Sequence, residues 1–77
     1  MIRYRLKELI AEKEFREERK ITIDEISKKS GIHRSTLTRI LRTKNYNTTV
    51  ENLEKLCNYF ECTVDKLVEF PSEKESN

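Results

Sequence analysis

The sequence has little glycine and proline, and it lacks any long apolar run. Its 77 residues include one glycine and one proline, which favours a small helical domain over a sheet with many turns. No apolar stretch is long enough to span a membrane, and the N-terminus "MIRYRLKELI" lacks the apolar region of a signal peptide. We therefore expect a cytoplasmic, all-α protein.

Residue types that bind metals or perform catalysis are also scarce. The two cysteines, Cys57 and Cys62, do not form a CxxC pair, and the single histidine, His33, is too distant in sequence to complete a zinc set. Both cysteines are therefore interpreted as reduced core residues. The sequence contains no paired nucleophile and base and no glycine-rich phosphate loop. We expect no enzymatic activity, no metal or other cofactor, and no small-molecule ligand.

Acidic residues are absent from the middle of the chain. None occurs between Glu25 and Glu51, whereas the rest of the chain has 10 basic residues (16 − 6) against 14 acidic ones. This segregation of positive charge indicates a polyanionic partner. The six basic residues of the interval are Lys28, Lys29, Arg34, Arg39, Arg42 and Lys44.

The sequence does contain helical periodicity, beginning at its N-terminus. Apolar residues recur with helical spacing from Ile2 onward, which predicts a first amphipathic helix. This pattern stops before Phe15, so within residues 13–21 the helix either continues as a solvated extension or gives way to a loop. The apolar stripe consists of Ile2, Leu6, Leu9 and Ile10.

A second helix is predicted to begin at Ile23. The preceding Thr22 and the following Glu25 form a capping box, in which each side chain bonds the backbone N–H of the other residue. The helix is expected to end at Gly31, which readily adopts the positive φ of a helix C-cap.

Three more helices are predicted after the glycine. The third covers about residues 34–42, the fourth follows Thr49, and the fifth follows Thr63. Residues 1–70 then form one domain, and residues 71–77 form a disordered polar tail. The inward apolar residues are Ile32, Leu37, Ile40 and Leu41, then Leu53, Leu56, Cys57 and Phe60, and finally Val64, Leu67 and Val68.

The second and third helices have the pattern of a helix-turn-helix. Two short helices flank a turn that contains glycine, Ser27 is a small residue four positions before Gly31, and apolar residues follow the turn. A small residue at that position lets the two helices cross closely.

The stretch "TIDEISKKSGIHRSTLTRIL" resembles the helix-turn-helix of lambda-repressor-like, Cro/cI-type (XRE) transcriptional regulators. The stretch "TTVENLEKLCNYFECTVDKLVEF" is similar to the last two helices of a compact subgroup, so the resemblance covers roughly residues 2–70. It implies a compact five-helix domain that binds double-stranded DNA as a repressor. The sequence departs from the family pattern at Ile23, often a phosphate-contacting glutamine, at Glu61, often glycine or asparagine, and in the longer connection "EFREERK".

The resemblance also implies which residues contact DNA. The outward face of the third helix would meet the major groove, where Arg34 can bond guanine O6 and N7. For His33 two interpretations are equally good, a contact with DNA or a helix-start residue without a partner. The base-contacting candidates are His33, Arg34, Ser35, Thr38 and Arg39. The phosphate-contacting candidates are Arg42, Lys44, Asn45, Tyr46, Asn47 and Thr49.

Two questions about partners stay open at this point. Proteins of this shape usually dimerise on two half-sites about 34 Å apart, which predicts a palindromic operator and a homodimer. Apolar residues near the C-terminus could form the dimer patch, or Phe70 could fold back over the first helix instead. The alternative function is an antitoxin-type protein-binding module that also binds its own operator. The residues of the candidate patch are Tyr59, Val68, Phe70 and Pro71.

Overall fold

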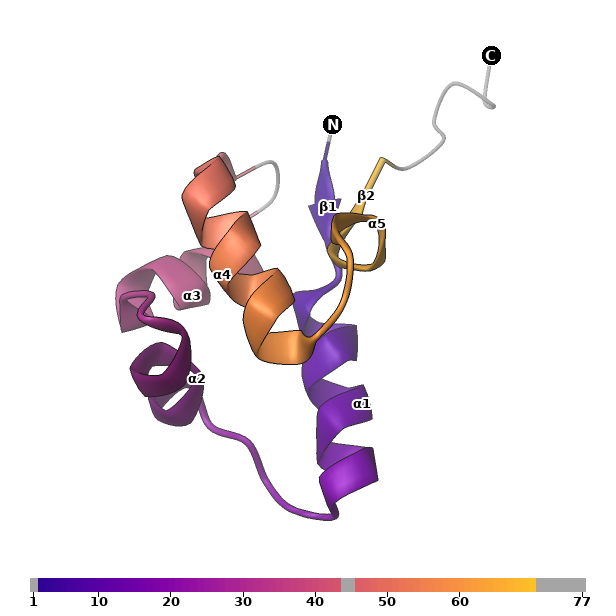
Figure 1. The fold of residues 1–77 in the computed structure, drawn as a ribbon. Coiled ribbons are helices and arrows are strands. Elements are labelled where there is room, and N and C mark those ends of the chain that lie inside the picture. The colour runs from indigo at the N-terminus through magenta and orange to yellow at the C-terminus, as the bar shows by residue number, and fades with distance from the viewer. Residues whose placement is uncertain (1, 44–45, 71–77) are drawn as a thin grey trace.

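Five helices make up most of the fold, and a short two-stranded sheet joins its two ends (Figure 1). The computed structural model describes residues 2–43 and 46–70, so Lys44, Asn45 and the predicted tail 71–77 lie outside the described residues. The predicted all-α, five-helix class is confirmed. The elements are β1 (Arg3–Tyr4), α1 (Leu6–Glu17), α2 (Ile23–Ser30), α3 (Arg34–Arg42), α4 (Val50–Phe60), α5 (Val64–Leu67) and β2 (Val68–Glu69).

A single apolar core holds the helices together. Every helix contributes at least one buried side chain to it, and no polar or charged residue among those described is buried. The inward faces predicted for the third and fourth helices are confirmed, with Leu41, Leu53 and Cys57 half-buried at the edge of the core. No helix in the described ranges has the length and apolar character needed to cross a membrane. The core residues are Leu6, Ile21, Ile26, Ile32, Leu37, Ile40, Leu56, Phe60 and Leu67.

The N-terminus differs from the predicted helix that starts at Ile2. Helix α1 begins only at Leu6, because β1 pairs antiparallel with β2 and places Tyr4 opposite Val68. The backbone N–H of Arg5 donates to the Leu67 carbonyl at 2.7 Å. This bond extends the pairing between the two ends of the chain by one residue beyond β1 and β2. Val68, predicted for the fifth helix, therefore lies in β2. Helical spacing alone could not reveal a strand partner at the far end of the chain.

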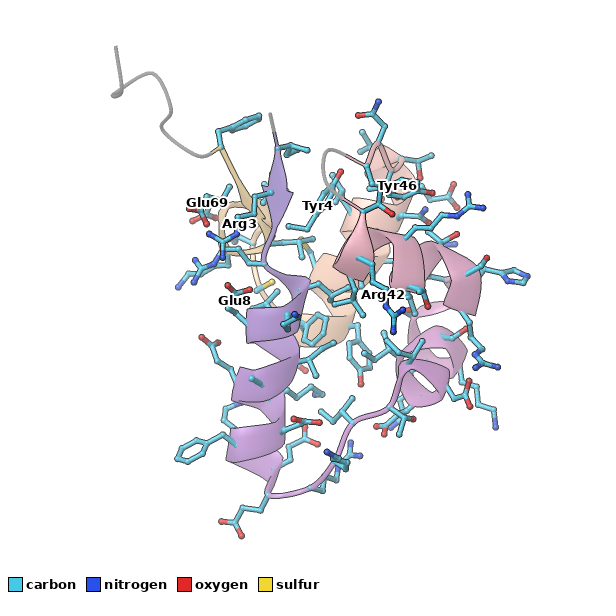
Figure 2. All side chains as sticks on the ribbon, turned by 180° about the vertical axis from the view of Figure 1, so that it is seen from behind. Arg3, Tyr4, Glu8, Arg42, Tyr46 and Glu69 are labelled. Carbon is cyan, nitrogen blue, oxygen red and sulfur yellow. The ribbon has the colours of Figure 1, made fainter. Side chains whose placement is uncertain are left out.

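Charged side chains surround this small sheet (Figure 2). Arg3 contacts Glu8 at 3.0 Å and Glu69 at 3.7 Å, and Arg5 approaches Glu69 at 3.9 Å. These side chains are well exposed, so each pair contributes at most about 1 kcal/mol. The alternative in which Phe70 folds back over α1 is wrong, because 72% of Phe70 is exposed.

Of the two alternatives for residues 13–21, the structure shows the first, in which the helix continues as a solvated extension. Helix α1 continues to Glu17, and its last turn leaves Phe15 85% exposed. Glu18 then ends the helix in the left-handed conformation, with φ 55°. The extension therefore adds helix without adding core.

The connection from α1 to α2 is fastened by charged side chains. Arg19 donates to both carboxylate oxygens of Glu25, at 2.9 and 2.7 Å, and to Glu17 at 2.9 Å. The backbone N–H of Ile21 donates to the Glu14 carboxylate at 2.9 Å. These hydrogen bonds attach the lengthened connection both to the end of α1 and to the start of α2.

The start of α2 confirms half of the predicted capping box. The Thr22 hydroxyl accepts from the Glu25 N–H at 3.1 Å, but the Glu25 carboxylate bonds Arg19 instead of the Thr22 N–H. Ile21, which the sequence reading missed, is buried beside the cap together with Ile26. An apolar residue just before the cap that packs with one four positions into the helix forms a hydrophobic staple.

Two further caps were predicted from threonines. Thr49 is confirmed, because its hydroxyl accepts from the Asn52 N–H at 3.1 Å. Thr63 does stand at the start of α5, but its hydroxyl donates to the Asp65 carboxylate, so side-chain capping by Thr63 is wrong.

We predict that Arg19 controls the titration of Glu25. Hydrogen bonds from Arg19 are the main cause that lowers the pKa of Glu25 below 4.5. A carboxyl whose pKa is lower in the folded chain stabilises the fold above its unfolded pKa, and the contribution disappears as the pH falls through the folded pKa. Arg19→Gln should therefore raise the pKa of Glu25 in an NMR titration. It should also reduce the difference in unfolding free energy between about pH 7 and about pH 3.

Lys20→Gln is the matched control for this prediction. Lys20 is the adjacent cation, and among the described residues it has no carboxylate partner, so its replacement should leave the Glu25 titration unchanged. An unchanged Glu25 pKa in Arg19→Gln would contradict the assignment.

Candidate nucleic-acid interface

The turn between α2 and α3 depends on a left-handed residue at Gly31. Gly31 has φ 84°, and its N–H donates to the Ser27 carbonyl at 2.9 Å, as predicted for a helix C-cap. A Cβ atom added at Gly31 would meet nothing within 4 Å. Glycine is therefore favoured here by its backbone conformation and not by lack of space.

Two serines of α2 bind the backbone of the first residue after the turn. The Ser27 hydroxyl donates to the Ile32 carbonyl at 2.6 Å, and the Ser30 hydroxyl accepts from the Ile32 N–H at 3.2 Å. Ile32 itself is buried, so its backbone groups need such partners. The sequence indicated a small residue at Ser27 but not these bonds, which fix where α3 starts.

Helix α3 presents a polar face to solvent. Leu37 and Ile40 are buried on its inner side, as predicted. Successive residues of a helix are about 100° apart, so the polar residues cover an arc of about 140° on the opposite side. This face consists of Arg34, Ser35, Arg39 and Arg42, which are exposed, and Thr38, which is half-buried.

Arg34 has a partner that the sequence reading missed. Its Nε atom lies 2.7 Å from the Oδ1 atom of Asp24 on α2, and the two side chains are 70% and 63% exposed. An exposed pair of this kind contributes at most about 1 kcal/mol, whereas a bidentate contact to guanine contributes about 1–3 kcal/mol of discrimination. The Asp24 contact is thus too weak to fix the Arg34 side chain in place. Only the packing of α2 against α3 brings the two residues together.

The other two arginines of α3 are unpaired in the described part of the chain. No described carboxylate lies within ion-pair distance of Arg39 or Arg42. Both stand in the last turn of α3, where the helix dipole favours positive charge. His33 is exposed at the helix start and makes no side-chain capping bond. Its role is thus left open by the fold.

The loop after α3 is tied to the N-terminal strand. The Tyr4 hydroxyl donates to the Tyr46 carbonyl at 2.7 Å, and Tyr4 and Tyr46 lie beside one another in Figure 2, where Arg42 is also visible. The Tyr46 side chain is half-buried against the core, while Asn47 is exposed. The sequence offered no signal for the contact between Tyr4 and this loop.

The start of α4 adds a further polar group to this region. The Thr49 hydroxyl accepts from the Asn52 N–H, and its own hydrogen makes no bond to a described residue. The Asn52 side chain donates to the Thr48 hydroxyl at 3.0 Å. This bond links the first turn of α4 to the residue before its cap. Within the described ranges, no three His, Cys, Asp or Glu residues gather as metal ligands would.

The comparisons with known proteins agree with this arrangement. Residues 5–73 match the family model described as the Cro/C1-type HTH DNA-binding domain. Searches of curated proteins and of solved structures find no match.

We predict that Gly31→Ala destabilises the fold by about 1–2 kcal/mol, the cost of a left-handed non-glycine residue. Gly31→Asn should cost less, because asparagine tolerates this conformation better. Urea unfolding of both variants measures the difference. Since an added Cβ meets no atom, equal stability of Gly31→Ala and the parent would show that the backbone is not strained there.

Proposed function

Because the chain belongs to the Cro/C1-type helix-turn-helix family of DNA-binding domains, we propose that it is a cytoplasmic transcriptional repressor that reads the major groove with α3. The observation that carries the proposal is the outward face of α3, which contains three arginines and two hydroxyl residues and no acidic residue. Such a face combines charge for the phosphates with hydrogen-bonding groups for base edges.

The first part of α3 is assigned to the bases. Arg34 leaves Asp24 and donates to guanine O6 and N7, while Ser35 and Thr38 serve several bases or a thymine methyl group. Arg39 reaches a neighbouring base or a phosphate. His33, exposed at the helix start, is the remaining candidate for base contact.

The end of α3 and the following loop are assigned to the phosphates. Arg42 has no described carboxylate partner, and the Thr49 hydroxyl keeps a hydrogen to donate. The Tyr4 contact supports the position of Tyr46, and the exposed Asn47 follows directly. Lys44 and Asn45 belong to the same proposed set. Contacts of this kind set the register of the protein on the duplex.

We predict that Arg34→Ala and Arg42→Ala affect DNA binding differently. Arg34→Ala should weaken specific binding roughly 5- to 150-fold, the loss of one bidentate base contact, with little change in nonspecific binding. Arg42→Ala should weaken specific and nonspecific binding alike and reduce the salt slope by about one. Titrations on an operator selected from random duplex DNA, at several salt concentrations, measure both effects.

Two control variants accompany this experiment. Lys66→Ala removes an exposed cation from α5, which packs against α4 and β2, and should leave binding nearly unchanged. Asp24→Asn removes the partner of Arg34 and an acidic group beside α3, so nonspecific affinity should rise. If Arg34→Ala and Arg42→Ala both bind like the parent, α3 does not read the groove.

We also propose that the protein acts as a homodimer on a palindromic operator. Phe70 is 72% exposed directly after β2, next to the half-buried Val68. Tyr59 does not belong to this patch, because its ring packs against the core with Lys13 over it and its hydroxyl is buried. Pro71 lies outside the described residues. An exposed aromatic residue of this kind is a suitable dimer anchor.

We predict that Phe70→Ala weakens self-association, measured by analytical ultracentrifugation. Phe15→Ala is the matched control, because Phe15 is even more exposed, at 85%, but belongs to α1. A monomer–dimer equilibrium that changes in Phe15→Ala and not in Phe70→Ala would exclude Phe70 as the anchor.

A further inference from the structure

The corner between α4 and α5 brings the two cysteines together. Glu61 adopts φ 55°, its N–H donates to the Asn58 carbonyl at 3.3 Å, and the Cys62 N–H donates to the Cys57 carbonyl at 3.0 Å. These two bonds around a left-handed residue define a Schellman motif, in which the side chains of the two outer residues usually make an apolar contact. Here the two outer residues are Cys57 and Cys62, so the contact joins two thiols.

The two thiols differ in their surroundings. Both are free and half-buried. Burial raises the pKa of the Cys57 thiol, and the charge and side-chain hydrogen bond of Cys62 raise it further, followed by Asp65. The influence of Cys62 on Cys57 agrees with the backbone motif, which brings the two residues together. A raised pKa keeps Cys57 as the thiol, so we assign the first attack on peroxide to Cys62 and only the later attack on the electrophilic sulfenic sulfur to Cys57.

Cys62 also opens onto a groove. The groove has a volume of about 340 Å³ and lies between α1 and the corner of α4 and α5. Two cations line it, Arg16 and Lys66, neither of which has a carboxylate within ion-pair distance among the described residues. Two carboxylates, Glu12 and Glu61, line it as well, so what the groove gives Cys62 is access for a small peroxide. The other lining residues are Leu9, Phe60 and Thr63.

We propose that Cys57 and Cys62 form a reversible intramolecular disulfide when the protein meets a peroxide. The Cys62 thiolate attacks one peroxide oxygen, the O–O bond breaks, and the products are a sulfenic acid and, after protonation, water. The Cys57 thiol then attacks the Cys62 sulfur, an S–S bond forms, and the second oxygen leaves as water. Two thiols and one hydrogen peroxide thus give one disulfide and two waters.

The bridge would reinforce a corner that the backbone already forms. The Cys62 N–H bond to Cys57 holds the two residues close, and α5 leads directly into β2, which pairs with β1. A bridge there restricts the unfolded chain and keeps the two helices in place. We therefore expect the oxidised protein to unfold at a higher temperature than the reduced protein, and a thiol reductant to reverse the shift.

The test is hydrogen peroxide treatment of the full chain, followed by tryptic mass spectrometry without reduction. Cleavage after Lys55 and Lys66 places both cysteines in the peptide 56–66. An intramolecular disulfide lowers the mass of this peptide by about 2 Da, through the loss of two hydrogens. A bridge between chains would instead give a peptide of nearly twice the mass and would overturn the proposal, as would oxidation without any disulfide.

Variants and an unfolded control test the assigned roles. Cys57→Ala should accumulate a sulfenic acid at Cys62 that dimedone traps, whereas Cys62→Ala should react far more slowly with peroxide. The parent chain unfolded in urea should form the disulfide more slowly than the folded chain. Equal rates in the two states would show that the Schellman corner contributes nothing.

Discussion

The polar face of α3 depends on one backbone conformation, the left-handed turn at Gly31. This turn ends α2 abruptly and lets Ser27 and Ser30 bond the backbone of Ile32. Ile32 can then enter the core, and the buried residues of α3 follow at fixed offsets. Because those residues must face inward, the polar residues on the opposite side of the helix have to face solvent. The polar face of α3 thus follows from the left-handed Gly31 and from the two serine bonds to Ile32.

Charge is distributed so that only part of the surface is left for a polyanion. Around β1, β2 and the connection from α1 to α2, cations pair with carboxylates, as in the contacts of Arg3 and Arg19. Among the arginines of α3 only Arg34 has such a partner in the described part of the chain, and its exposed contact with Asp24 is weak. Part of the positive charge far from α3 is thus compensated within the protein, although Arg16, Lys20 and Lys66 have no described carboxylate partner, whereas α3 keeps two unpaired arginines on one face.

Contacts between distant parts of the chain hold the interface in place. The Tyr4 hydroxyl connects β1 to the loop after α3, and β1 itself is held by β2 at the other end of the chain. The Schellman corner lies directly before α5, which leads into β2. The two cysteines at this corner thus lie at a joint of the fold, although they were interpreted from the sequence only as core residues.

Val64, predicted from the sequence to face inward, is 52% exposed, but the sequence by itself determined the order of the five helices, the inward faces of α3 and α4, the left-handed glycine and the outward set on α3. These follow from local rules, namely apolar spacing, helix caps and the conformational freedom of glycine. The contacts of this set with DNA stay predictions. Only the tertiary structure decided the strand pairing of Tyr4 with Val68, the Asp24 partner of Arg34, and the bond from Tyr4 to Tyr46. These depend on how separate elements pack, and no local pattern reports which distant groups will meet.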